Sequence, residues 1–390
     1  MRGGWRILAA GLTFAACLLL VPADLPAGED AKKPHPPPPP PSKEFAAKLK
    51  DIPYRIVYET FRDGNWELFS AKADGADPVN LTRTPDANEL YPHVSPDGKK
   101  VCFVVDEFEP GATQPKTRSA HFMNIDGTGR TKVAGGIREA CWKADGTALA
   151  LLPLEFERFT YEDYATKGVR FYTLADGKTA DHPNKDLYHL YNLCWSPDGK
   201  WFIATVHGGM GYKHAILAFE ADGTKVFDLK IPGCRPDLSP DGRKITWGAS
   251  DWELCIADID FAGPTVRVSN RRAVVKSAEP IKIYHSDWSP DGRYVAFSRG
   301  PEKKTLNFAP EMIGIRAAGW NICVADANAE SVWAEITTDG NCNKEPDWAP
   351  AGVRLKKVAP LSEFVILSRL QAAKNLSWRF PQRDSSLRSE

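Results

Sequence analysis

Ionisable side chains recur at two fixed places ahead of a Pro-Asp-Gly segment that the chain repeats. One place is four residues before the Asp of this segment, and the other lies two residues earlier still. Side chains alternate along a β-strand, so both places face the same side of a strand. The first place holds the aspartate set, which consists of His93, Cys141, Cys194, Asp237, Asp287 and Asp347. The second holds the mixed set, which consists of Tyr91, Glu139, Asn192, Arg235, His285 and Glu345.

Carboxylate, imidazole and guanidinium groups that gather in one place can bind a polar ligand. A divalent cation is one such ligand, because carboxylates and imidazoles are its usual partners, but no established metal-binding spacing such as HExxH occurs. We therefore predict no cofactor and leave the cation open. A purely structural role, in which these groups hydrogen-bond to one another and to water, is the alternative. The predicted ligand-binding residues are Tyr91, His93, Glu139, Arg235, Asp237, His285, Asp287, Glu345 and Asp347.

The segment that carries these residues occurs six times. The Asp positions, with Ala351 in the sixth copy, are 48, 53, 43, 50 and 60 residues apart, which indicates a repeat architecture. Pro-Asp-Gly is a tight-turn signal, and apolar β-type runs such as 100–105 and 201–206 follow the turns. Two further runs bring each repeat to four strands. We therefore predict an all-β, six-bladed β-propeller over residues 53–352.

The two ends of the repeat region complement each other. The chain enters at Arg55–Tyr58 with the last three strands of a blade and leaves at Glu345–Trp348 with a first strand. We predict that strands from both ends form one blade, which closes the ring and leaves no open sheet edge. An open β-array or two sandwiches is the alternative. The tryptophans that alternate with the aspartate set are expected to pack between blades: Trp142, Trp195, Trp288 and Trp348.

Turns and long loops are expected on opposite faces of the propeller. The Pro-Asp-Gly turns define the turn face. The connections between second and third strands define the loop-rich face, and they include 106–119, 153–168, 207–213 and 299–319. Long variable loops on one face of a repeat scaffold are where binding usually occurs. We therefore expect the nine residues to converge at the channel mouth on the loop-rich face and to bind a protein or glycan of the cell envelope there.

The repeated segment resembles the propeller repeats of the TolB-like family, known from the periplasmic Tol-Pal system. The resemblance rests on Trp-Ser-Pro-Asp-Gly followed by an apolar strand, then Ala-Asp-Gly, then Leu-Thr. The closest stretch is Arg62-Asp-Gly-Asn-Trp-Glu-Leu, with Ala73-Asp-Gly and Asn80-Leu-Thr. It covers residues 54–352 and implies the same propeller fold. A Pro-rich stretch stands where TolB carries an α/β domain.

Similar repeats also occur in secreted pectin-fragment lyases, which use histidines and a metal in the propeller mouth. The residues that such a site would use here are His182, His189, His207 and His214, and scattered surface histidines are the alternative. No GxSxG segment is present, so a serine hydrolase is not expected. We expect a non-catalytic binding protein without catalytic residues. A metal-assisted polysaccharide lyase or hydrolase in the channel mouth is the alternative function.

The two ends of the chain differ from the propeller in composition. Residues 1–27 join Arg2 and Arg6 to an apolar stretch, as in a signal peptide, so we expect a periplasmic or secreted protein. Lipid attachment at Cys17 and an uncleaved anchor are the alternatives. Residues 28–52 are expected to be a stiff Pro-rich linker. Residues 353–390 carry eight Lys and Arg against three Asp and Glu, which gives a net charge of +5. They also contain one candidate helix, which is expected to pack on the propeller or to contact an acidic surface. A frayed end is the alternative.

The overall composition limits the partners. Basic and acidic residues number 50 each, so net charge gives no reason to expect nucleic acid. Seven cysteines follow the signal segment without a CxxC spacing, which leaves their pairing open. We expect a monomer that contacts a membrane only through an N-terminal anchor.

Overall fold

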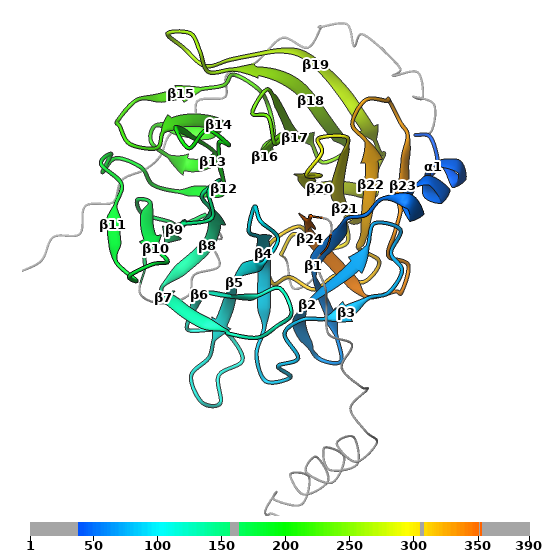
Figure 1. The fold of residues 1–390 in the computed structure, drawn as a ribbon, viewed down its shortest axis with the longest axis horizontal. Helices are drawn as coiled ribbons and strands as arrows, with labels where there is room; N and C mark the ends of the chain where they lie inside the picture. The colour runs from blue at the N-terminus through cyan, green and yellow to red at the C-terminus, as the bar shows by residue number, and fades with distance from the viewer. Residues whose placement is uncertain (1–37, 157–163, 305–307, 351, 353–390) are drawn as a thin grey trace, which may run out of the picture. The chain divides into compact units, whose positions relative to one another are not determined.

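Six four-stranded antiparallel sheets are arranged around a common centre as the blades of a propeller (Figure 1). The computed structural model describes residues 38–156, 164–304, 308–350 and Gly352. The predicted signal peptide and C-terminal tail lie outside the described residues. Within them, the six-bladed propeller is confirmed.

The blades follow one another along the chain. Blade 1 contains β1 (Arg55–Arg62), β2 (Asn65–Lys72), β3 (Val79–Asn80) and β24 (Cys342–Ala349). Blade 2 contains β4 (Glu89–Val94), β5 (Lys100–Glu107), β6 (Thr117–Asn124) and β7 (Thr131–Gly135). Blade 3 contains β8 (Ile137–Trp142), β9 (Ala148–Pro153), β10 (Arg170–Thr173) and β11 (Thr179–Asp181). Blade 4 contains β12 (Leu190–Trp195), β13 (Trp201–Gly209), β14 (Tyr212–Glu220) and β15 (Val226–Asp228). Blade 5 contains β16 (Cys234–Leu238), β17 (Lys244–Ser250), β18 (Glu253–Asp260) and β19 (Arg267–Lys276). Blade 6 contains β20 (Ile281–Trp288), β21 (Tyr294–Pro301), β22 (Asn321–Asp326) and β23 (Trp333–Glu335).

Blade 1 closes the ring with strands from both ends of the domain. β24 pairs antiparallel with β1, and the register places Trp348 opposite Ile56 and Asp347 opposite Val57. Each of the other blades is continuous in sequence. The predicted closure is therefore confirmed, and it fixes the innermost strand of blade 1 next to that of blade 2.

The hydrophobic core lies between neighbouring blades. Trp142 packs with residues of blades 2 and 3, Trp288 with residues of blades 5 and 6, and Trp348 with residues of blades 6 and 1. Trp142 Nε1 also donates to the His93 carbonyl at 2.8 Å, and Trp348 Nε1 donates to the Asp287 carbonyl at 3.2 Å. The tryptophans therefore pack between blades, as predicted, and two of them hold the backbone of aspartate-set residues.

Hydrogen bonds within the Pro-Asp-Gly turns stabilise them. In blade 2 the Asp97 carboxylate accepts hydrogen bonds from the Ser95 hydroxyl at 2.7 Å and the Lys99 amide at 3.0 Å. The same Ser-Asp pair recurs in blade 5 between Ser239 and Asp241. Asp side chains that bond to the backbone two residues ahead are typical of tight turns. The innermost strands are therefore anchored at the turn face.

A short helix precedes the propeller. α1 (Lys43–Lys48) is followed by the 3-10 turn η1 (Leu49–Asp51), and Phe45 and Leu49 are buried against blades 6 and 1. This packed segment lies within the predicted linker 28–52, so the ordered region begins before residue 53. The sequence analysis missed it because so short an apolar pattern has no clear period. In the described residues, no helix has the length and apolar character needed to cross a membrane.

Candidate functional site

Each innermost strand contains a bulge at or next to its mixed-set residue. In β4 the pairing with β5 shifts between Leu90 and His93, and Tyr91 has a φ of 59°. Asn192, Arg235, His285 and Glu345 also have positive φ values. A bulge changes the direction in which side chains point. Strict alternation therefore does not describe these strands, and the two sets occupy different depths.

The six innermost strands surround a cavity of about 510 Å³, here called the funnel. Eight of the nine predicted ligand residues line it, all except Glu139. The prolines of five turns also line it: Pro96, Pro197, Pro240, Pro290 and Pro350. The funnel therefore opens at the turn face. Our expectation that these residues meet at the loop-rich face is wrong, because the aspartate set lies at the turn end of each innermost strand.

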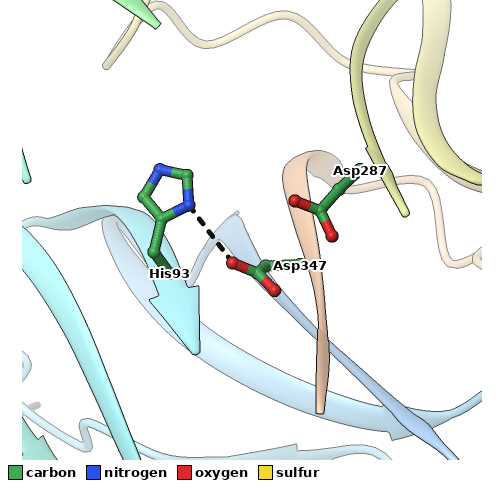
Figure 2. Close-up of side chains that lie close together, drawn as sticks. All are labelled: His93, Asp287 and Asp347. Carbon is green, nitrogen blue, oxygen red and sulfur yellow. Dashed lines mark hydrogen bonds and ion pairs between the residues drawn. The ribbon is translucent and has the colours of Figure 1, made fainter. Parts of the chain in front are cut away.

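Three members of the aspartate set point toward one another in the funnel (Figure 2). His93 Nδ1 lies 3.2 Å from Asp347 Oδ2, which also accepts the Val94 amide at 3.0 Å. One ligand atom each from His93, Asp287 and Asp347 lies within 4.8 Å of the other two. In the described residues this is the only such group of three His, Cys, Asp or Glu side chains.

A third carboxylate faces this group. Asp237 Oδ2 accepts the Trp288 amide at 3.0 Å, and Oδ1 accepts the Cys194 thiol at 3.1 Å. Burial raises the pKa of Asp237 to about 6, and the carboxylate of Asp347 adds to this shift. Burial and repulsion from Asp347 and Asp237 raise the pKa of Asp287 well above its ordinary value. Simultaneous ionisation of all three carboxylates is therefore unfavourable in the funnel unless positive charge is close to them.

His93 is the cationic partner that the chain supplies to these carboxylates. Burial opposes its protonation, but the hydrogen bond to Asp347 and the nearby negative charge raise the pKa of His93 overall. A protonated imidazole balances one carboxylate of the three. The two other basic side chains that line the funnel, Arg235 and His285, are held by Glu345.

The mixed set forms the buried floor of the funnel. Arg235 contacts Glu345 at 3.2 Å, and His285 Nε2 contacts the same carboxylate at 2.8 Å. Glu139 is bonded to Arg138 and to the Leu193 amide, and Tyr91 is bonded to Asn192. These contacts link the mixed set into a largely buried hydrogen-bonded network.

The loop between β21 and β22 supports this floor from the loop-rich side. The fully buried ammonium group of Lys344 donates to the carbonyls of Pro310, Met312 and Ile315 at 3.3, 2.8 and 3.1 Å. Arg235 donates to the Glu311 carbonyl at 3.0 Å. A second cavity of about 310 Å³ lies beyond the floor and shares Arg235 with the funnel.

The predicted histidine cluster forms only in part. His207 and His214 face each other with 3.1 Å between their Nδ1 atoms, and Tyr164 packs against His207 near the second cavity. His189 bonds instead to Glu155 at 2.7 Å. His182 is buried among Phe171 and Phe219 and bonds to the Glu220 carbonyl. The four histidines therefore do not form one metal site.

Two other features bear on function. The large apolar side chains exposed within the described residues are Phe108, Phe156 and Tyr188, and all three precede or follow strands at the loop-rich face. The sequence analysis missed Tyr188, which no repeat pattern marks. The seven cysteines of the described residues are all unpaired.

Comparison with solved structures supports the fold. TolB from Acinetobacter baumannii is similar with a TM-score of 0.55 and 18% identity, over 77% of this chain and 67% of that one. One chain of a nidogen/laminin complex is similar with a TM-score of 0.52 and 9% identity, over 76% of this chain and 98% of that one. Hydrazine synthase of Kuenenia stuttgartiensis is similar with a TM-score of 0.51 and 10% identity, over 81% of this chain and 50% of that one.

These likenesses agree with the six-bladed β-propeller fold of this chain, which TolB is similar to. The chain spans about two thirds of the TolB structure and half of the hydrazine synthase chain. No family model and no curated protein matches the sequence. At these identities the comparisons establish the fold, and function has to be argued from the site.

Proposed function

We propose that the protein is a non-catalytic binding module that takes a cationic group of a protein partner into the funnel. The observation that carries this proposal is the meeting of Asp237, Asp287 and Asp347 in a cavity open at one end, where His93 is the basic side chain of the described residues that contacts one of them. Buried carboxylates without enough positive charge are unfavourable, and a bound cation relieves that cost. The funnel is therefore suited to a Lys or Arg side chain.

The funnel walls fit such a side chain as well. Trp195, Trp288 and Trp348 line the cavity together with the turn prolines. Apolar surfaces accept the methylene stem of Lys and Arg. A protein segment is therefore the partner that the site favours, and the TolB likeness together with the predicted signal peptide supports a location in the cell envelope.

A defined peptide tests this proposal. Calorimetry would compare Ac-Gly-Lys-Gly-Lys-Gly-amide with its glutamine counterpart on the full chain, on Asp287→Asn/Asp347→Asn and on Asp241→Asn. Asp241 is a matched control because it lies on the turn face, outside the funnel lining. We expect the lysine peptide alone to bind, with affinity falling about tenfold or more in the double variant, about 1.4 kcal/mol or more. Equal binding to all three proteins would refute the proposal.

The second candidate function is a metal-assisted polysaccharide lyase or hydrolase. The geometry of His93, Asp287 and Asp347 favours it, because one imidazole and two carboxylates can hold a divalent transition metal. These residues would hold the ion, which would supply Lewis-acid activation of an acidic sugar. Elemental analysis of purified protein and a screen on polysaccharide fragments distinguish the two functions. Stoichiometric metal with fragment cleavage that requires His93 would favour the enzyme.

A further inference from the structure

The charged and imidazole side chains that line the funnel come from four of its six blades, namely blades 5, 6, 1 and 2. Within the described residues, the lining of blades 3 and 4 contains none of these groups, and its polar members are Asn192 and the Cys194 thiol. The other lining residues of these two neighbouring blades are here called the apolar wall: Cys141, Trp142, Ala144, Leu193, Trp195 and Pro197.

The apolar wall lies across the funnel from two of the three carboxylates. In the ring of six blades, blade 3 stands opposite blade 6, and blade 4 stands opposite blade 1 (Figure 1). Blades 6 and 1 contribute Asp287 and Asp347, and blades 3 and 4 contribute Cys141 and Cys194 at the same place in the repeat. The funnel therefore presents carboxylates on one side and an apolar surface on the other.

The turn of blade 3 interrupts the ring of prolines at the funnel mouth. In blade 4 the turn proline, Pro197, lies beside Gly242 of the next turn, and the same contact recurs between blades 5 and 6. Blade 3 carries Ala144 at the position of this proline, and the side chain beside Gly199 is that of Lys143. A methyl group fills less space than a proline ring, so the rim is less filled between blades 3 and 4.

Trp195 differs from the other tryptophans of the repeat. Trp142 and Trp348 are buried, and each donates Nε1 to a carbonyl of the neighbouring blade. Trp195 donates Nε1 at 3.1 Å to the Gly199 carbonyl of its own turn, and its ring contacts Phe202 with 4.5 Å between the ring centroids. It is only half-buried and lines the funnel. Part of the indole surface therefore remains available to a ligand.

We propose that the funnel recognises a cationic residue next to a large apolar one, and that the apolar side chain packs on the apolar wall. Neighbouring side chains of an extended chain point to opposite sides. A segment that directs its cationic group toward the carboxylates of blades 6 and 1 therefore directs the adjacent side chain toward Trp195 and Ala144. Burial of apolar surface there contributes affinity that a glycine cannot supply. This inference rests on the proposed function and adds a second residue to what the site recognises.

Calorimetry with short peptides on the full chain tests this inference. The leucine peptide Ac-Gly-Leu-Lys-Leu-Gly-amide would be compared with the glycine peptide Ac-Gly-Gly-Lys-Gly-Gly-amide and the glutamine peptide Ac-Gly-Leu-Gln-Leu-Gly-amide. The variant Ala144→Gln places a polar chain on the apolar wall. Pro240→Gln is the matched control, because it places the same chain at the same turn position in blade 5. Circular dichroism would show whether each variant is folded.

We expect the leucine peptide to bind the wild type about tenfold more tightly than the glycine peptide, about 1.4 kcal/mol. This gain should disappear in Ala144→Gln and persist in Pro240→Gln. Equal affinity of the two lysine peptides for the wild type would overturn the inference even if a variant fails to fold, and so would an undiminished gain in folded Ala144→Gln. The proposed function is judged separately by the glutamine peptide, since its binding as tightly as the leucine peptide would show that the funnel does not select a cation.

Discussion

The imidazole of His93 and the carboxylate of Asp347 lie 3.2 Å apart, although 254 residues separate them in the sequence. Asp347 reaches this position because β24 pairs with β1 and so brings the C-terminal strand next to blade 2. The contact between His93 and Asp347 in the funnel therefore depends on ring closure. The same strand pairing therefore closes the ring and positions Asp347 in the site.

Removing the negative charge of Asp287 should stabilise the protein at high pH. The raised pKa of Asp287 means that its protonated form favours folding, and that this contribution is lost as pH rises from the unfolded pKa through the folded pKa. Asp287→Asn keeps the neutral shape. We expect the unfolding free energy to increase at pH 8 and to stay almost unchanged at pH 4.

Chemical unfolding across pH 4 to 8 measures this difference. Asp241→Asn serves as the control, because hydrogen bonding to Ser239 lowers the pKa of Asp241 and gives no gain at high pH. A pH-independent effect of Asp287→Asn would show that the Asp287 carboxylate is already neutralised.

Repetition made much of the fold predictable. Six copies of one turn-strand segment indicated six blades, and the incomplete blades at Arg55–Tyr58 and Glu345–Trp348 indicated closure. The residues of the aspartate set could be identified because each stands at a fixed distance from a turn. Their convergence follows from the symmetry of the propeller.

The different depths of the two sets in the funnel could not be predicted in the same way. Strict alternation assigns Asp237 and Arg235 the same role, but the positive φ of Arg235 places a bulge between them. The floor also depends on Lys344 and the carbonyls of the β21–β22 loop, and these contacts follow no repeat. Bulges and single buried charged side chains depend on tertiary contacts, so a sequence repeat does not predict them.

Lys344 should be essential for the stability of the floor. Its buried ammonium group donates to three carbonyls and lies 3.7 Å from the buried carboxylate of Glu59. Lys344→Met leaves these acceptors without a donor and Glu59 without its partner. We expect a loss of about 3–5 kcal/mol in unfolding free energy, against almost none for exposed Lys99→Met. Similar losses in both variants would contradict the structural role.

A divalent metal and the lysine peptide should compete for the funnel. Both require Asp287 and Asp347, but the metal alone uses the His93 nitrogen as a ligand. His93→Asn should therefore weaken Zn²⁺ binding by about tenfold or more, about 1.4 kcal/mol, and the peptide by less. Calorimetric titration of each probe, alone and with the other present, measures this. Independent binding of the two would place them at different sites.

The chain should be processed and exported. Residues 1–27 have the composition of a signal peptide, so we expect a mature protein that starts near residue 24 or 28, outside the cytoplasm. Cell fractionation with N-terminal sequencing measures both properties. Unprocessed protein in the cytoplasm would contradict export and an envelope partner.

Quantitative pull-down from an envelope fraction tests the central claim most directly. The full chain, Asp237→Asn/Asp287→Asn/Asp347→Asn and Asp241→Asn would be immobilised in equal amounts, with circular dichroism confirming that each is folded. If the funnel binds a cationic segment, the wild type and Asp241→Asn should enrich the same protein, and the triple variant should lose it by about tenfold or more, about 1.4 kcal/mol. Retention of the same partner by the triple variant would contradict the account.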